Sequence, residues 1–279
     1  MKILSLFDGI SCGRIALERA GIPVEVYYAS EIDKYATQIS QKNYPDIIRL
    51  GDVCKITKEM VGEVDMIIGG SPCQSFSNAG NRTGFEGKSG LFYEFVRLVN
   101  EVKPKYFLLE NVKMKQEWQD VISKELGVKP IEINSSLVSG QNRKRLYWTN
   151  IPNVKQPEDK GIFIQDIMEQ NISGEYYLED KTNLGYVCSG DFRYDEGFRW
   201  RKGNKSPTIS TKGGASKSGS ILFTDGERIR RATPIECERL QTLPDNYTQG
   251  VSSTARYKAI GNGWTVDVIA HIFKNLTNN

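Results

Sequence analysis

Short apolar runs alternate with amphipathic stretches along roughly the first 150 residues of the chain. In the stretch 91–102, for example, the apolar residues recur at the spacing of one helical face, which predicts a helix that packs on a sheet. Strands that alternate with helices are typical of a largely parallel sheet covered on both faces. We therefore predict an α/β fold, with strands at 3–7, 24–29, 64–68, 106–109, 131–138 and 145–151.

The pattern weakens after residue 151, where glycine, serine, lysine and asparagine become frequent. The segment 152–226 still carries four aromatic residues between positions 192 and 200, and a disordered insertion would lack this apolar mass. Helical spacing returns at 233–240 and at 266–276. The sequence therefore predicts a larger domain formed by 1–151 and 227–279, and a second, smaller domain at 152–226.

Composition limits the classes of protein to which the chain can belong. The 279 residues are 39% hydrophobic and 25% charged, and none of the apolar runs approaches the ~20 residues of a membrane span. The five cysteines show no metal-binding spacing and His271 is the single histidine, so we expect no zinc site. The chain opens on a strand-like run rather than on a secretory leader. These features predict a cytoplasmic protein without a metal or membrane partner, and the net charge of +3 is too small to prove a polyanionic partner.

Glycines and acids at the predicted strand ends outline a nucleoside site. The first strand runs into a turn that contains Gly9 and Gly13 and then into a helix, and glycines at such a turn let a ligand approach the helix N–H groups. Turns of this kind are also common in purely structural places. Glu31 ends the second strand and can accept hydrogen bonds from ribose hydroxyls, and Asp52 is placed to accept from an adenine amino group. The turn lacks the pattern GxGxxG, which favours a nucleoside with a short charged tail over a dinucleotide.

A cysteine and a further acid follow the next two strands. Cys73 follows a Gly-Gly-Ser-Pro turn at the predicted carboxyl edge of the sheet, where a thiol near helix N–H groups can act as a thiolate nucleophile. A buried filler is the commoner role of a cytosolic cysteine, but only Cys73 has this context. Glu110 ends the following strand and could supply a proton or hydrogen bond to a ring, the alternative being an acid at a helix N-terminus. Arg145 belongs to a basic cluster and could point inward at the start of a strand, although most such clusters are solvated turns. The loop 75–90 carries four glycines and is suited to close over a substrate.

The ordered set of motifs resembles the DNA (cytosine-5)-methyltransferase family and spans nearly the whole chain. In the order of the family, the motifs are Phe7-Asp8-Gly9, Glu31, Asp52, Pro72-Cys73-Gln74, Glu110-Asn111-Val112, Gln141-x-Arg143-x-Arg145, Arg231-x-Thr233-Pro234-x-Glu236-x-x-Arg239-Leu240-Gln241 and Gly261-Asn262. The region 152–226 takes the place of the variable target-recognition region. The first motif, Asp-Gly-Ile-Ser-Cys-Gly, and Ser71 before Pro-Cys are similar to the Dnmt3-like branch, whereas Thr233-Pro234 and Leu240-Gln241 resemble bacterial and phage enzymes.

The resemblance implies a Rossmann-like mixed seven-stranded sheet, S-adenosylmethionine as the methyl donor, and a cytosine flipped out of double-stranded DNA. It implies that the Cys73 thiolate adds to C6, that protonated Glu110 bonds N3, and that Arg145 holds the base, with Arg143 of the same motif as a further catalytic residue. The cofactor contacts that it implies are Phe7, Asp8, Gly9, Ile10, Cys12, Gly13, Glu31, Ile32, Asp52, Val53, Pro72, Leu91, Asn262, Gly263 and Trp264. The DNA contacts that it implies are Gln74, Ser75, Arg82, Arg199, Arg201 and Lys202.

The predicted smaller domain also carries a local excess of positive charge. From 191 to 217 there are seven basic residues against three acids, which suits phosphate contacts, although lysines on a solvated loop would give the same composition. A Dnmt2-like tRNA methyltransferase is the main alternative, but its typical Cys-Phe-Thr stretch is absent. A non-catalytic relative would be expected to lose Cys73 or Glu110, and a small-molecule methyltransferase would leave the basic region unexplained. We expect a monomeric, nucleoid-associated enzyme of bacterial or phage type, and the sequence leaves open whether it serves a restriction–modification system.

Overall fold

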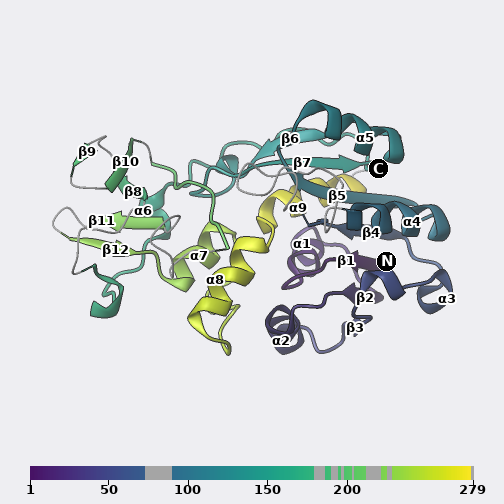
Figure 1. Ribbon diagram of the computed structural model, residues 1–279, viewed down its shortest axis with the longest axis horizontal. Coiled ribbons are helices and arrows are strands. Elements are labelled where there is room, and N and C mark those ends of the chain that lie inside the picture. The colour runs from purple at the N-terminus through teal and green to yellow at the C-terminus, as the bar shows by residue number, and fades with distance from the viewer. Residues whose placement is uncertain are drawn as a thin grey trace. The chain divides into compact units, whose positions relative to one another are not determined.

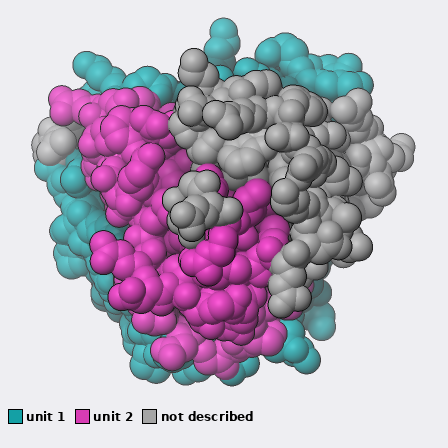
Figure 2. All heavy atoms as spheres, turned by 90° about the vertical axis from the view of Figure 1, so that its left-hand side faces the viewer, with its two compact units in different colours: residues 1–133, 144–156, 268–279 teal, residues 134–143, 157–267 magenta. Residues whose placement is uncertain are grey.

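The computed structural model describes residues 1–72, 90–178, 186–189, 194–195, 198–202, 204–211, 221–224 and 228–277. Contacts divide the chain into two compact units, coloured teal and magenta in Figure 2. Unit 1 comprises 1–133, 144–156 and 268–279, and unit 2 comprises 134–143 and 157–267. The sequence-based limits of the smaller domain, 152–226, stay a prediction.

Unit 1 contains a sheet of seven strands in the order β3-β2-β1-β4-β5-β7-β6 (Figure 1). Strand β1 pairs in parallel with β2 and β4, β2 with β3, and β4 with β5, whereas β7 runs antiparallel to β5. The α/β class and the mixed seven-stranded sheet predicted from the sequence are therefore confirmed. The strands are β1 (Lys2–Leu6), β2 (Val26–Ser30), β3 (Ile48–Arg49), β4 (Met66–Gly69), β5 (Tyr106–Val112), β6 (Ile131–Asn134) and β7 (Lys144–Thr149).

Buried apolar side chains on both faces of β1 explain why helices pack on both faces of this sheet. Leu4 and Leu6 belong to an apolar cluster that also holds Phe95 of α4 and Ile122 of α5. Ile3 points to the opposite face and is equally buried. Right-handed β-α-β crossovers place α1 and α2 on that face. The helices of unit 1 are α1 (Cys12–Arg19), α2 (Lys34–Asn43), α3 (Lys58–Val61), α4 (Phe92–Val102), α5 (Gln116–Leu126) and most of α9 (Val266–Phe273).

Unit 2 contains a second sheet, of five strands in the order β12-β11-β8-β10-β9. Its core includes Phe223 of β11 and Leu240 of α7, both fully buried. The strands are β8 (Tyr186–Ser189), β9 (Tyr194–Asp195), β10 (Phe198–Lys202), β11 (Ile221–Thr224) and β12 (Ile229–Arg231). The helices are α6 (Ile164–Ile167), α7 (Pro234–Leu240) and α8 (Ser253–Asn262).

Two predicted elements end three or more residues earlier than their apolar pattern suggested. The strand expected at 131–138 stops at Asn134, whose side chain accepts from the Ser136 N–H at 3.1 Å and begins the 3₁₀ turn Ser135–Leu137. A side chain that bonds its own backbone competes with the next strand pair, which explains the stop. The helix expected at 266–276 is α-helical to Phe273 and closes with the 3₁₀ turn Lys274–Leu276.

The described part of the chain offers no helix with the length and apolar character needed to span a lipid bilayer. Among the same residues, no group of three or more histidine, cysteine, aspartate or glutamate side chains is placed to hold a metal ion.

Candidate active site

The carboxyl ends of four parallel strands bring the candidate residues of unit 1 to one edge of its sheet. Strand β1 leads into Asp8, β2 into Glu31 and β4 into Ser71, while Glu110 lies near the end of β5. In open α/β sheets this edge is where ligands bind. β4 ends at Gly69, where a Cβ atom would lie 2.9 Å from the Leu6 carbonyl oxygen, so only glycine fits there.

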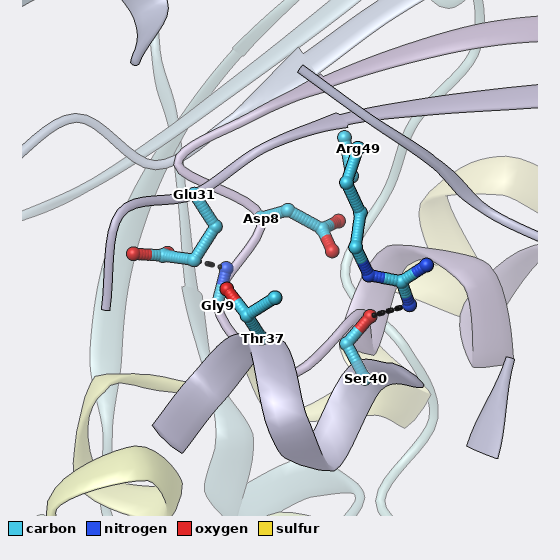
Figure 3. A pocket seen from close by; sticks show the side chains of 7 residues that line it. Asp8, Gly9, Glu31, Thr37, Ser40 and Arg49 are labelled. Carbon is cyan, nitrogen blue, oxygen red and sulfur yellow. Dashed lines mark hydrogen bonds between the residues drawn. The ribbon is translucent and has the colours of Figure 1, made fainter. Parts of the chain in front are cut away.

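The turn after β1 is tied to the end of β2 through Glu31. The Gly9 N–H donates to Glu31 Oε2 at 2.8 Å (Figure 3), and Gly9 has a φ of +60°, a conformation that favours glycine. Glu31 Oε1 accepts from the N–H groups of Ile32 and Asp33 at 2.8 and 2.7 Å. Three main-chain donors therefore fix the carboxylate in one orientation. A carboxylate offers about four lone-pair sites, so Oε2 can still accept from a ligand hydroxyl.

A small cleft opens beside this contact. Figure 3 shows Glu31, Gly9 and Thr37 toward one side of it, Arg49 and Ser40 toward the other, and the Asp8 side chain between them. Its lining consists of Asp8, Gly9, Ala29, Glu31, Thr37, Ser40 and Arg49. A small cleft lined mostly by polar residues next to an oriented acid suits part of a nucleoside better than an apolar ligand.

Asp8 is an acid of this edge whose pKa is raised. Its Oδ2 accepts from the Ser11 hydroxyl at 2.5 Å and its Oδ1 from the Tyr27 hydroxyl at 2.8 Å. Withdrawal from solvent raises the pKa of Asp8 to about 6, an effect that hydrogen bonds from Ser11, Ser5 and Tyr27 partly offset and the charge of Glu31 reinforces. The same burial raises the pKa of Tyr27 well above its ordinary value, so the tyrosine stays a neutral donor.

The remaining acid of the predicted nucleoside site begins a turn after β3. Asp52 Oδ1 accepts from the Cys54 N–H at 3.0 Å and caps the 3₁₀ turn Val53–Lys55. Val53 is buried in the apolar cluster of α4, whereas Ile32 is 78% exposed. A large apolar side chain left in solvent beside Glu31 is available to pack on a flat ring.

Glu110 and Arg145 form an ion pair between neighbouring strands β5 and β7. Arg145 Nε lies 3.0 Å from Glu110 Oε1, and the two side chains are only 13% and 11% exposed. The next residue, Asn111, donates from Nδ2 to Ser71 Oγ at 3.1 Å and is itself buried. The end of β5 thus both pairs an acid with a cation and holds the segment that leads to Cys73. Asn111 stood in a sequence motif, but nothing in the sequence gave it this role.

Arg143 has a different environment from Arg145. It is 4% exposed and donates to the main-chain carbonyl of Gly263 at 3.0 Å, and to those of Ile209 and Gly261 at 3.4 Å. Gln241 Nε2 donates to the same Gly263 carbonyl at 2.9 Å. Within unit 2, Arg143 therefore holds the main chain of the segment that contains Asn262 and Gly263, and its catalytic role stays a prediction.

The other predicted site residues differ in what the structure shows of them. Phe7 and Leu91 are partly buried against the apolar cluster of α4, whereas Ile10, Cys12 and Gly13 are buried. Pro72 and Trp264 are of intermediate exposure, and Asn262 is exposed at the end of α8. The backbone of β10 carries Arg199, Arg201 and Lys202. The predicted residues Cys73, Gln74, Ser75 and Arg82, with most of the loop 75–90, lie outside the described residues.

The sequence analysis missed Ala29, Thr37, Ser40 and Arg49 of the cleft, and also Tyr27, which donates to Asp8. Arg49 of β3 donates from Nη2 to Ser40 Oγ at 3.0 Å, while its buried Nε has no partner among the described residues. Tyr27 read as an ordinary strand residue, because an apolar ring with a polar tip gives no sequence signal for the acid that it meets.

Comparison with known proteins gives the same family along the whole chain. The family model of C-5 cytosine-specific DNA methylases matches residues 1–278. Type II methyltransferase M.NlaX of Neisseria lactamica is 31% identical over 299 residues, which cover 99% of this chain and 96% of that protein. Type II methyltransferase M.HhaI of Haemophilus parahaemolyticus is 27% identical, with 99% and 94% covered.

Solved structures show the same fold at lower sequence identity. The Entamoeba histolytica methyltransferase EhMeth superposes with a TM-score of 0.81 at 17% identity, covering 100% of this chain and 98% of that one. The Dnmt2 methyltransferase of S. pombe gives a TM-score of 0.75 at 19% identity, with 98% and 97% covered. Since the family model spans nearly every residue and a relative above 30% identity spans both chains, the protein belongs to the C-5 cytosine-specific DNA methylase family.

Proposed function

We propose that the protein transfers a methyl group from S-adenosylmethionine to C5 of a flipped-out cytosine in double-stranded DNA. The observation that carries the proposal is the buried Glu110–Arg145 pair on β5 and β7, beside the Asn111–Ser71 contact that holds the segment before Cys73. An acid and a guanidinium at one strand end suit the N3 and O2 atoms of a cytosine ring, because one can donate a proton and the other hydrogen bonds.

Cytosine C5 is too weak a nucleophile to react unaided, so the protein must first activate the ring. The Cys73 thiolate forms a bond to C6, while Glu110 in its protonated form gives its proton to N3. The electron pair of the C5–C6 bond is then available at C5, and S-adenosylmethionine supplies the electrophilic methyl group. Loss of the C5 proton to a base or water expels the Cys73 thiolate and restores the C5–C6 double bond, and N3 returns its proton to Glu110. Arg145 holds O2 throughout and balances the charge that develops on the ring.

The residues around the cleft fit the adenosine part of the methyl donor. Glu31 keeps one acceptor site next to the Gly9 N–H, which suits ribose hydroxyls. The exposed Ile32 side chain suits the adenine face, and Asp52 the adenine amino group. Asn262, Gly263 and Trp264 stay predicted cofactor contacts from the resemblance, and Arg143 and Gln241 hold the main chain of the segment on which they lie.

The names of the relatives support a proposal for the setting of the reaction. The similar proteins are named as Type II methyltransferases of bacteria and, in one case, as the orphan methyltransferase M.SPRI of Bacillus phage SPR. We assign this chain to the same setting, as a cytoplasmic enzyme that acts as a monomer on the nucleoid, with the region 152–226 as its DNA-reading domain. Its excess of basic residues supports phosphate contacts.

Methyl transfer to nucleic acid by matched cysteine variants tests the proposal. Cys73→Ser should abolish transfer of labelled methyl to duplex DNA, because a hydroxyl is far less acidic than a thiol and cannot add to C6 at neutral pH. Cys54→Ser is the control, since Cys54 is an exposed free thiol. Bisulfite sequencing of DNA from expressing cells then identifies the methylated sequence.

A trapped covalent adduct between protein and DNA distinguishes the covalent mechanism from binding without reaction. DNA with 5-fluorocytosine at the target should form a stable complex with wild type and with Cys54→Ser, but not with Cys73→Ser, because the C5 substituent can no longer leave. Turnover by Cys73→Ser above a tenth of wild type would overturn the covalent mechanism. Methyl transfer to tRNA in place of DNA would instead assign the protein to the Dnmt2-like reaction.

A further inference from the structure

A chain of polar contacts lies behind the glycine turn and connects four elements of unit 1. Asp8 accepts from Ser11 and from Tyr27 of β2. The hydroxyls of Ser11 and Ser40 lie 2.7 Å apart, and Arg49 donates to Ser40. Figure 3 shows the Asp8 carboxylate pointing toward the Arg49 side chain. We call these five residues the Asp8 cluster.

The charge of Asp8 is costly to bury, and the neighbouring guanidinium of Arg49 is the cation that interacts with it. The carboxylate is withdrawn from solvent and lies near Glu31, a group of the same sign, so the pKa of Asp8 rises to about 6. Near pH 7 it is nevertheless mostly ionised. A neutral amide of the same shape would bury no charge, but it would put a donor in place of one of the two oxygens that accept from Ser11 and Tyr27. The polar and titratable groups around Asp8 are Ser5 of β1, Ser11 at the start of α1, Tyr27 and Glu31 of β2 and its end, Ser40 of α2 and Arg49 of β3.

The same carboxylate holds a turn with unusual backbone geometry. Phe7 and Ser11 have φ values of +57° and +61°, a region that side chains other than glycine rarely adopt. Ser11 stands at the N-cap of α1, yet its hydroxyl makes no capping bond to the helix and is directed to Asp8. Gly9 lies between them and gives its N–H to Glu31. Asp8 thus anchors the turn that orients the candidate ribose acceptor.

We propose that Asp8 is a positioning residue for the methyl donor, whose ionised carboxylate holds the glycine turn through Ser11 and Tyr27 so that Gly9 keeps Glu31 oriented. The proposal rests on the proposed function, because it takes Glu31 as the ribose acceptor. When Asp8 takes up a proton, one of its acceptor sites becomes a donor, and Ser11 or Tyr27 loses its partner. Affinity for the donor therefore falls as the pH drops through the pKa of Asp8.

Calorimetric titration with S-adenosylmethionine between pH 7.5 and 5 tests this role in the full chain. Asp8→Asn should raise the dissociation constant about tenfold at pH 7.5, and the ratio of the variant to wild type should shrink toward one at pH 5. The control is Asp65→Asn, which makes the same chemical change at the other end of β1, where Asp65 accepts from the Lys2 N–H. It should follow the wild-type profile. Titration of the donor's own groups is common to all three proteins and cancels in the ratios.

Thermal melting of the ligand-free proteins separates positioning from mere structural support. Because the pKa of Asp8 is raised in the folded state, its stability contribution is complete below its ordinary value of 3.8 and is lost as the pH rises through about 6. Asp8→Asn should therefore melt several degrees above wild type at pH 7.5, and the advantage should shrink toward pH 5. A residue kept only for structure would give the opposite sign.

Ser11→Gly serves as a second variant that keeps the backbone, since a φ of +61° suits glycine. Removing the hydroxyl removes a bond that lowers the pKa of Asp8, so the fall in affinity should begin at higher pH than in wild type. Two outcomes would overturn the role of Asp8 and leave the proposed function intact. One is wild-type affinity and a wild-type pH profile in Asp8→Asn, and the other is weaker binding together with a lower melting temperature in that variant. A wild-type protein that binds no S-adenosylmethionine would overturn the cofactor assignment and this proposal with it.

Discussion

For variants of the Glu110–Arg145 pair, we predict that stability and activity change in different ways. Replacing Arg145 with Met leaves the Glu110 carboxylate without its cation in a site where only 11% of the acid is exposed. Breaking a fully buried pair costs ~3–5 kcal/mol. Because both side chains keep some contact with water, we expect a loss of ~2–3 kcal/mol in the free energy of unfolding.

The reverse change is milder. Glu110→Gln keeps an oxygen for Arg145 Nε, and Arg145 Nη1 still donates to the Lys144 carbonyl, so the cost should be ~1 kcal/mol. The double variant contains no unpaired charge and should be more stable than Arg145→Met by ~1 kcal/mol. A coupling energy of that sign is the signature of a direct pair.

Urea unfolding followed by far-ultraviolet circular dichroism and by the fluorescence of the four tryptophans, among them the buried Trp148 of unit 1, measures these differences. The control is Lys2→Met, whose ion pair with Glu25 is 3.7 Å long and exposed, and which should cost less than ~1 kcal/mol. Methyl transfer should fall by a factor of ~10²–10⁴ in Glu110→Gln, because Gln cannot give a proton to N3. The double variant should regain stability but no activity. An Arg145→Met protein as stable as Lys2→Met would refute the energetic argument, and full turnover by Glu110→Gln would refute the chemical one.

Two further predictions concern unit 2. Glu236 is fully buried and its carboxylate accepts two bonds from Arg230 and one each from the N–H groups of Thr233 and Glu169, so Glu236→Gln should cost ~3 kcal/mol in thermal or urea unfolding. Asp245→Asn, in an ion pair whose acid is 45% exposed, should cost less than ~1 kcal/mol, and equal losses in the two variants would show that burial does not set the energy. On β10, joint replacement with Gln should lower the slope of log affinity against log salt by ~0.9 for each lost phosphate contact on duplex DNA, with unchanged affinity for the methyl donor. The replaced residues are Arg199, Arg201 and Lys202, and an unchanged slope and methylation pattern would exclude them from the DNA-reading surface.

The sequence predicted the sheet of unit 1 well because its strands are buried on both faces. Such strands read as unbroken apolar runs, and five of the six predicted strands overlap an observed strand over most of their length. The strands β8 to β12 gave no such signal, because each has only two to five residues and charged residues interrupt the apolar ones in β9, β10 and β12. Segments this short do not repeat an alternation often enough to stand out from a polar loop.

The positions of Glu31 and Glu110 followed from the strand ends alone, because parallel strands deliver their carboxyl ends to one edge. The contacts of Asp8 could not be predicted in this way. Its partners Ser11 and Tyr27 come from the start of α1 and from β2, and a buried hydroxyl looks the same in a sequence as an exposed one. The polar groups that fix a site are thus harder to predict than the acids that they orient.

Arg143 and Arg145 show where residue spacing stops carrying information. Positions two apart share a face only while both lie in a strand, and β7 begins at Lys144, so the alternation rule reaches Arg145 but not Arg143. The two arginine side chains therefore have different partners. Arg145 meets the carboxylate of Glu110, whereas Arg143 meets main-chain carbonyls at Gly261 and Gly263. Three carbonyl oxygens that converge in a buried place need a donor with several N–H groups, and a guanidinium supplies five. Residue 261 itself has to be glycine, because a Cβ there would lie 2.6 Å from main-chain atoms of Ser210. An ammonium can also donate to three carbonyls, as Lys205 does to those of Ser136, Ser139 and Ile162. Arg143 differs because its donors lie on separate nitrogen atoms of one flat group, Nη1 for Ile209 and Nη2 for Gly261 and Gly263, so arginine suits this place through the shape of its donors as well as through its charge.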